Sequence, residues 1–213
     1  MKPFLLVLSA PSGGGKTTVA KALLAAREDV GYSVSATTRP PRAGERDGVD
    51  YHFLSREEFD RRVAAGAFIE WTAYGGHRYG TLRAEVERVQ ATGRHLVLDI
   101  DVVGARIVRE RCQNVVRVFI IPPSAEALVD RLGGRKTEDR ADLVKRLRHA
   151  VDELAEAPEY DYVIVNSDKT QTVAEVAAII DAETHRPGRY PDLDATLTAL
   201  AREIARRADA LEG

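Results

Sequence analysis

Residues 4–18 read FLLVLSAPSGGGKTT, an apolar run that leads into three consecutive glycines, a lysine and two threonines. A continuous apolar run of this length is typical of a strand buried on both faces of a parallel sheet. From Ala10 to Thr17 the residues have the spacing of the phosphate-binding motif G-x-x-x-x-G-K-[ST], with Ala10 in place of the first glycine. The stretch therefore predicts a buried first strand, a phosphate-binding loop and a helix that begins at Lys16.

The loop has the chemistry that a nucleoside triphosphate requires. Glycines allow successive backbone N–H groups to converge on phosphate oxygens, and the start of the helix adds its dipole. Lys16 supplies a mobile cation for the transferred phosphate, and the Thr17 hydroxyl can ligate Mg²⁺. The alternative is a glycine-rich turn without a ligand, but the strand before it and the helix after it favour binding. The predicted triphosphate-binding residues are Pro11, Ser12, Gly13, Gly14, Gly15, Lys16, Thr17 and Thr18.

The rest of the chain continues the alternation of strands and helices. Strand-like runs occupy residues 4–9, 31–37, 95–100, 116–121 and 162–166. Helical patterns occupy residues 16–27, 81–90, 125–132, 139–156 and 173–185. Capping-box patterns, Ser55 with Glu58 and Thr172 with Glu175, mark two helix starts. This order predicts an α/β fold with a doubly wound parallel sheet of the P-loop NTPase type.

Two segments interrupt the alternation, and a third follows it, so we divide the single domain 1–213 into parts. Residues 36–80 are rich in Arg, Gly, Pro and aromatic residues and predict a mixed α+β insertion, whereas the arginine-rich residues 131–157 predict a helical lid. Residues 187–213 form a helical extension whose amphipathic helix, 193–211, we expect to pack on its own domain, with another subunit as the alternative. The oligomeric state therefore stays open. The remaining core comprises residues 1–35, 81–130 and 158–186.

Composition narrows the class of protein and its partners. The 213 residues include 31 Lys and Arg against 33 Asp and Glu, a formal net charge of −2, which argues against a nucleic-acid or anionic membrane partner. No apolar run approaches the length of a membrane span. The single cysteine, Cys112, excludes a disulfide framework and is typical of a reducing compartment, so we expect a cytoplasmic protein.

Several further motifs, in a fixed order, resemble those of the guanylate kinase family. They are SVSATTRPPRAGE at 33–45, DYHF at 50–53, FIEW at 68–71, YGT at 79–81 and LDID at 98–101. The resemblance covers about residues 4–186 of this chain. It implies that the γ-phosphoryl group of MgATP is transferred to GMP, giving ADP and GDP, in purine nucleotide metabolism, and dGMP is a further candidate acceptor.

The resemblance also implies a binding cage for the phosphate of GMP. In it, Arg39 and Arg42 bind the phosphate and the hydroxyl groups of Tyr51 and Tyr79 complete the cage. This suits arginine, because its planar pair of donors matches two phosphate oxygens. The alternative for either arginine alone is an exposed loop residue.

The same resemblance assigns Ser35, Glu70 and Thr81 to the guanine base. A carboxylate only accepts hydrogen bonds, and guanine offers N1–H and a 2-amino group side by side. Adenine has an acceptor at N1, so it would leave a buried Glu70 unpaired, which gives strong discrimination. If this motif stood alone, Glu70 would instead be an edge-strand carboxylate.

The chemistry needs counter-charges rather than a general base. The second pKa of a phosphate monoester is about 6, so the acceptor is mostly dianionic at neutral pH, and catalysis reduces to positioning and charge neutralisation. The resemblance implies that Asp99, with Thr17, serves the metal and the acceptor, and that Asp101 supports the base. For Asp101 the alternative is a helix cap. The predicted catalytic cations are Lys16, Arg39, Arg135 and Arg146.

The basic segment matches the lid of the family, whose arginines fold onto the phosphates. Arg131, Arg135 and Arg146 occupy the matching positions, and closure of a lid excludes water. A solvated basic helix face is the alternative. Asn166 matches a family residue that contacts the adenine of ATP, although Ser167 follows it here in place of the usual aspartate.

Two other functions would require a different set of residues in the sequence. A P-loop kinase that acts on a sugar phosphate would not need Glu70 and Ser35, which are present. A non-catalytic guanylate-kinase-like domain that binds phosphorylated peptides would keep the acceptor cage and typically lose the phosphate loop. Because Lys16, Thr17 and Asp99 are all present, the sequence favours an enzyme.

Overall fold

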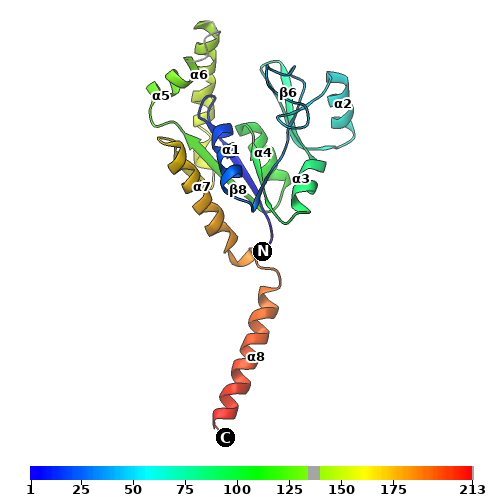
Figure 1. Cartoon of the computed structure of the whole chain (residues 1–213), viewed down its shortest axis with the longest axis vertical. Helices are drawn as coiled ribbons and strands as arrows, with labels where there is room; N and C mark the ends of the chain where they lie inside the picture. Colours follow the sequence, from blue (N-terminus) through cyan, green and yellow to red (C-terminus); the bar gives the residue numbers. More distant parts are fainter. Residues whose placement is uncertain (134–139, 213) are drawn as a thin grey trace.

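The chain forms a five-stranded parallel sheet with helices on both faces, which confirms the predicted fold class (Figure 1). This computed structural model describes residues 1–133 and 140–212. The strand order is β2-β7-β1-β8-β9, and all neighbouring pairs are parallel. The strands are β1 (Leu5–Ser9), β2 (Val30–Tyr32), β7 (His95–Asp99), β8 (Val115–Ile121) and β9 (Tyr162–Val165).

Strand β1 is buried on both faces, which explains its continuous apolar sequence. Leu6 and Leu8 belong to the core beneath α1 (Lys16–Ala26) and α7 (Lys169–Thr184). Leu5 and Val7 point the other way, into the core beneath α3 (Arg83–Gln90) and α4 (Val102–Arg111). The side-chain alternation of a strand thus serves two cores.

A smaller mixed sheet, in the order β4-β3-β6-β5, stands beside the main one. Its strands are β3 (Ala36–Thr37), β4 (His52–Phe53), β5 (Phe68–Tyr74) and β6 (His77–Leu82), and α2 (Arg56–Ala64) covers it. Only β3 and β4 are parallel, and the other pairs are antiparallel. The sheet and α2 share a small core of Ala36, Phe59, Phe68 and Leu82. This unit, the insertion, is drawn at the upper right of Figure 1.

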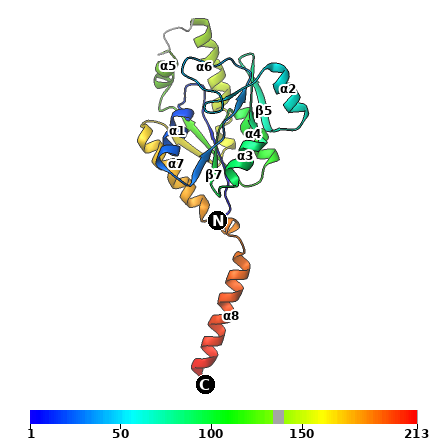
Figure 2. The same cartoon turned by 45° about the vertical axis from the view of Figure 1, so that its right-hand side comes forward.

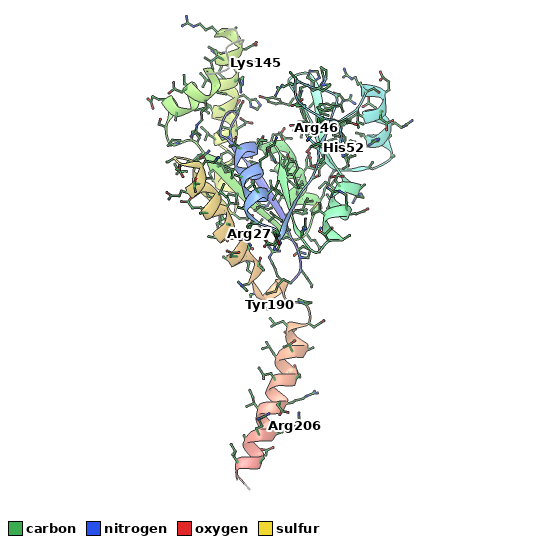
Figure 3. The ribbon with its side chains drawn as sticks, viewed as in Figure 1. Arg27, Arg46, His52, Lys145, Tyr190 and Arg206 are labelled. Carbon is green, nitrogen blue, oxygen red and sulfur yellow. The ribbon has the colours of Figure 1, made fainter. Side chains whose placement is uncertain are left out.

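Two helices, α5 (Ala125–Gly133) and α6 (Arg140–Leu154), rise on the other side, at the upper left of Figure 1. They pack on each other through Leu128, Leu132 and Ala150, and the turn η1 (Ala157–Glu159) leads back to the sheet. Arg135, a predicted catalytic residue, lies outside the described residues. In Figure 3, Lys145 marks α6, and Arg46 and His52 mark the insertion.

Two local predictions are wrong, and one helix was missed. The strand predicted over 31–37 is two strands, β2 and β3, which lie in different sheets because the chain crosses between them at 33–35. Helix α4 was not predicted, because its two initial valines and its internal Gly104 have low helix propensity. The predicted cap at Thr172 is also wrong, since Asp168 caps α7 by accepting a hydrogen bond from the Gln171 N–H (2.8 Å). The predicted cap at Ser55 is confirmed, because its hydroxyl accepts from the Glu58 N–H.

Helix α8 (Leu193–Glu212) extends away from the body in both Figure 1 and Figure 2. Four of its large apolar residues are between 52% and 88% exposed: Leu197, Leu200, Ile204 and Leu211. The expectation that this helix packs on its own domain is therefore wrong. Its amphipathic pattern is local, but packing needs an uncovered apolar surface, and helices already cover both faces of the main sheet. Among the described helices, none has the length and apolarity to cross a membrane.

The turn that precedes α8 is anchored, although the helix is not. Arg189, in η2 (Pro187–Arg189), is 7% exposed and pairs with Glu183 at 3.0 Å. Its guanidinium also lies 4.3 Å from the centre of the Phe4 ring. Figure 3 shows Tyr190 at the junction and Arg206 far out on α8. The compact body thus ends near Tyr190.

Candidate active site

The loop between β1 and α1 requires glycine at two positions. Gly13 and Gly15 have φ angles of +84° and +95°, in the left-handed region that side chains disfavour. A Cβ on Gly13 would also lie 2.7 Å from Leu132 of α5, and one on Gly15 would lie 2.7 Å from the Asn166 amide. Gly15 is the N-cap of α1, so the free N–H groups of that helix start inside the loop. This geometry is that of an anion-binding loop.

Lys16 and Asp99 form an ion pair beside the loop. Strand β7 lies next to β1 in the sheet, which brings Asp99, its last residue, to the loop end of β1. The Lys16 Nζ is 3.2 Å from an Asp99 carboxylate oxygen, and the Asp99 side chain is 6% exposed. Burial by itself disfavours a charged lysine, but the neighbouring carboxylate outweighs it, so the pKa of Lys16 is raised. The ammonium group therefore stays charged, while Thr17 and Thr18 lie exposed in the first turn of α1.

Asn166 and Arg131 support the same loop from the end of β9 and from α5. The Asn166 side chain donates a hydrogen bond to the Gly14 carbonyl (3.0 Å) and accepts one from the Thr172 hydroxyl (3.1 Å). Arg131 donates to the backbone carbonyl of Asn166 (2.9 Å). Asn166 thus contacts the loop directly and Arg131 contacts it through Asn166, and the amide of Asn166 has partners within the protein.

Ser12, at the rim of the loop, contacts the helix α6. Its hydroxyl accepts hydrogen bonds from the Arg146 guanidinium, at 3.3 Å from Nε and 3.2 Å from Nη2. Its backbone N–H donates to the Glu153 carboxylate at 2.8 Å. Sequence reasoning missed Glu153. The available signal was its position three residues after Ala150, on the face of α6 that is buried.

On the insertion, Arg39, Tyr51 and Tyr79 come together. The guanidinium of Arg39 lies 5.4 Å from the centre of the Tyr51 ring, and the Tyr51 and Tyr79 rings are 6.1 Å apart. Arg39 is 8% exposed and pairs with Glu45 at 2.9 Å, while the same carboxylate accepts from the Arg42 N–H at 2.8 Å. Burial disfavours the charge on Arg39, but Glu45 outweighs it and the pKa of Arg39 is raised. Glu45, which sequence reasoning also missed, thus holds the Arg39 guanidinium and the backbone of Arg42, and the motif 33–45 that contains it was the available signal.

Glu70 is a buried carboxylate in β5, with 2% of the residue exposed. Its Oε1 accepts a short hydrogen bond from the Thr81 hydroxyl, at 2.6 Å. Its Oε2 faces Gly104 of α4, where an added Cβ would lie only 2.8 Å away. Burial raises the pKa of Glu70 to about 7; the Thr81 hydrogen bond opposes this shift, and the charge of Asp101 adds to it. A carboxyl group poised near neutral pH in a buried site is typical of a functional residue.

Asp101 and Ser35 complete this side of the site. Asp101 is the N-cap of α4, since its Oδ1 accepts from the Gly104 N–H (2.7 Å), and its Oδ2 accepts from the Thr72 hydroxyl (2.9 Å). The helix-cap interpretation is thus correct, and it places Asp101 near Glu70. Ser35 directly precedes Ala36, which pairs with Gly80 of β6, next to Thr81.

Comparisons with known proteins find related sequences and a related structure. A sequence model of the family described as guanylate kinase matches residues 2–183. A guanylate kinase of Symbiobacterium thermophilum is 51% identical over 88% of this chain and 89% of its own length, and one of Sphingopyxis alaskensis is 46% identical over 84% and 82%. The crystal structure of a guanylate kinase from Anaplasma phagocytophilum superposes with a TM-score of 0.77 at 36% identity, covering 92% of this chain and 94% of that one.

Proposed function

The chain belongs to the guanylate kinase family and is an ATP:GMP phosphotransferase, and we propose that the residues described above carry out this reaction. The γ-phosphoryl group of ATP passes to GMP, giving ADP and GDP. The observation that carries the assignment of the acceptor site is Glu70, a buried carboxylate with a pKa of about 7 that Thr81 holds in place. ATP and GMP are made and used inside cells, so we also propose a cytoplasmic location.

The donor site of the proposal is the loop between β1 and α1. Its backbone N–H groups at Gly13, Gly15 and Lys16 bind the phosphates of ATP, and the charge of Lys16 attracts the transferred phosphoryl group. Asp99 orients Lys16 through the ion pair at 3.2 Å. Because the acceptor is already a dianion, the protein supplies orientation and positive charge rather than a base.

We include Mg²⁺ in the proposal, held by the Thr17 hydroxyl and the Asp99 carboxylate. Both are oxygen donors at the loop, the type of ligand that Mg²⁺ prefers, and this ion usually takes few protein ligands together with substrate phosphates. When bound, the ion neutralises negative charge on the phosphates.

In the acceptor site, Arg39, Arg42, Tyr51 and Tyr79 bind the phosphate of GMP. The stacked position of Arg39 beside Tyr51, and the contacts of Glu45, place its guanidinium before any ligand arrives. That preorganisation lowers the entropic cost of binding.

The base of GMP is recognised by Glu70, with Thr81 and Ser35 beside it. Ionised Glu70 accepts from N1–H and from the 2-amino group of guanine. In the ligand-free protein burial raises the pKa of this carboxyl to about 7, so its protonated form is populated near neutral pH. Binding of guanine therefore favours release of that proton. Asp101 fixes the helix start against which Glu70 lies.

The proposal assigns closure to the lid, residues 131–157, and to the insertion, residues 36–80. Arg131 and Arg146 already contact the loop through Asn166 and Ser12. Closure brings these charges onto the phosphates and excludes water, which otherwise would hydrolyse ATP. Arg135 belongs to this set by its sequence.

The test is a coupled assay of ADP release with GMP, dGMP, IMP, AMP, UMP and CMP offered separately. We expect turnover with GMP, a lower kcat/KM with IMP, which lacks the 2-amino group, and none with the three other bases. A kcat/KM for AMP equal to that for GMP would refute the role of Glu70. No turnover with GMP would refute the function.

A further inference from the structure

Two side chains of helix α6, one positively and one negatively charged, contact Ser12. Arg146 donates to the Ser12 hydroxyl, and Glu153 accepts from the Ser12 backbone N–H at 2.8 Å. The two residues are seven positions apart, which is two helical turns, so they lie on the same face of α6. The lid helix is therefore joined to the phosphate loop at one residue, by a positive and a negative side chain.

Glu153 is a buried carboxylate beside the phosphate-binding loop. It is 5% exposed, although it is next to a site for a polyanion. A buried carboxylate is costly unless hydrogen bonds compensate for its lost hydration. The Ser12 N–H provides one such bond, and the His149 Nδ1, one turn earlier in α6, lies 3.4 Å from the same carboxylate oxygen.

This face of α6 also reaches the insertion. The His149 ring meets the Tyr74 ring of β5 edge to face, with centres 5.2 Å apart. Tyr74, His149, Glu153 and Ser12 thus form a continuous row of contacts. The row connects the proposed acceptor side, the lid helix and the proposed donor loop.

The Ser12 N–H directly precedes the glycines of the loop. Those glycines have no side chains to hold their shape, and Gly13 has a positive φ, so their conformation depends on contacts with the rest of the protein. Asn166 holds the middle of the loop through the Gly14 carbonyl, α1 continues from its far end, and Glu153 holds its near end through the Ser12 N–H. A hydrogen bond to a charged acceptor is about twice as strong as one between neutral groups.

We propose that Glu153 is a positioning residue of the ATP site, which holds the phosphate loop in its binding conformation through the Ser12 N–H. Arg146 neutralises phosphate charge, whereas Glu153 touches no phosphate and acts through the backbone. The inference rests on the proposed function, since it takes the loop as the site of the ATP phosphates.

The experiment compares four variants of the full chain: Glu153→Ala, Glu153→Asp, Glu153→Gln and the control Asp152→Asn. Asp152 is the exposed neighbour of Glu153 on α6. Gln keeps an acceptor oxygen at the same distance along the side chain, whereas Asp keeps the charge but withdraws it by about 1.5 Å, one carbon–carbon bond. The measurements are the Kd of MgADP for the free protein by calorimetry, the KM values for ATP and GMP, and the thermal unfolding midpoint.

We expect Glu153→Ala and Glu153→Asp to weaken MgADP binding and to raise KM for ATP by about tenfold or more. The KM for GMP should change by less than about twofold. The MgADP affinity of the Gln variant should be closer to that of the wild type than the affinity of the Asp variant. The Asp152→Asn control should match wild type. If Glu153→Ala does not fold, the MgADP affinities of the Gln and Asp variants relative to each other decide the question.

Three results would overturn the inference. The first is an unchanged MgADP affinity in the Ala and Asp variants. The second is an equal rise of the KM values for ATP and GMP together with a lower unfolding midpoint. The third is an Asp variant whose MgADP affinity is closer to that of the wild type than the affinity of the Gln variant. A wild-type protein that phosphorylates GMP while these variants bind MgADP normally refutes the inference alone. A wild-type protein that does not phosphorylate GMP refutes the proposed function.

Discussion

Replacing Glu70 with Gln is expected to stabilise the ligand-free protein at pH 8 while impairing its use of GMP. Glu70 is 2% exposed, and burial raises its pKa from 4.5 to about 7. The folded state thus favours the protonated carboxyl, and its contribution to stability is fully present below pH 4.5 and is lost as the pH rises through 7. Glutamine is neutral at every pH, and its amide oxygen still offers an acceptor to the Thr81 hydroxyl.

The size of the effect follows from the two pKa values. Each unit between them corresponds to about 1.4 kcal/mol, so ionised Glu70 lowers the free energy of unfolding by about 3 kcal/mol at pH 8. The Gln variant should gain about that amount at pH 8, and less than about 1 kcal/mol at pH 5, where the wild-type carboxyl is already protonated. For a chain of this size, a gain of about 3 kcal/mol raises Tm by roughly 6–12 °C.

The assay is urea unfolding of both proteins, without nucleotide, at pH 5 and pH 8. Equal unfolding free energies at pH 8 would refute the reasoning that burial of an ionised Glu70 is costly. A gain of the same size at pH 5 and pH 8 would show that packing, rather than charge, separates the two side chains. Either result would remove the physical basis for the raised pKa.

The same ionisation should make GMP use depend on pH. As the pH falls below 7, kcat/KM for GMP should fall by about fivefold over the first unit and by nearly tenfold per unit below that, because only ionised Glu70 accepts from guanine. The phosphate of GMP also titrates, near pH 6, and the Gln variant separates the two effects because it retains only the phosphate titration. If both proteins give the same pH profile, Glu70 is not the group that titrates.

Three further predictions concern other parts of the molecule. Lys16→Ala should abolish turnover and leave the calorimetric Kd for GMP nearly unchanged, whereas turnover near the wild-type rate would exclude Lys16 from catalysis. Gly104→Ala should raise KM for GMP by about tenfold and leave KM for ATP unchanged, because the new Cβ would lie 2.8 Å from Glu70 and displace its flexible carboxylate. If the variant and the wild type have the same KM for GMP, the carboxylate has room to move. Deletion of residues 193–213 should leave both KM values and the unfolding midpoint unchanged, since the apolar residues of α8 lie exposed, away from the body. A loss of activity or stability in that deletion would show that α8 supports the body.

Short-range features were predictable from the sequence. The phosphate-binding loop at 10–17 was predictable because its glycines, Lys16 and the flanking strand and helix are close together in the sequence. The parallel sheet follows from apolar runs that only a strand covered on both faces can bury. Ordered motifs also predicted the family, which the comparisons confirm.

The predictions failed where one stretch of sequence fits two environments. Residues 31–37 form a single β-rich run, yet β2 pairs with β7 and β3 pairs with β6, in separate sheets. Helix α4 has valines and a glycine at its start, and contacts with the main sheet and with β5 stabilise it despite that propensity. Asp101 then serves two purposes, as a helix cap and as a neighbour of Glu70.

The sequence by itself determined the chemistry that this protein has available: a phosphate loop, a set of arginines and one carboxylate suited to guanine. Tertiary structure decided which charges meet, because ion pairs and hydrogen bonds depend on distances that folding sets between remote residues. It brought Asp99 to Lys16 and Glu153 to the Ser12 N–H, 141 residues away, and it raised the pKa of Glu70 by burial. It also left α8 without a surface to cover on its own domain.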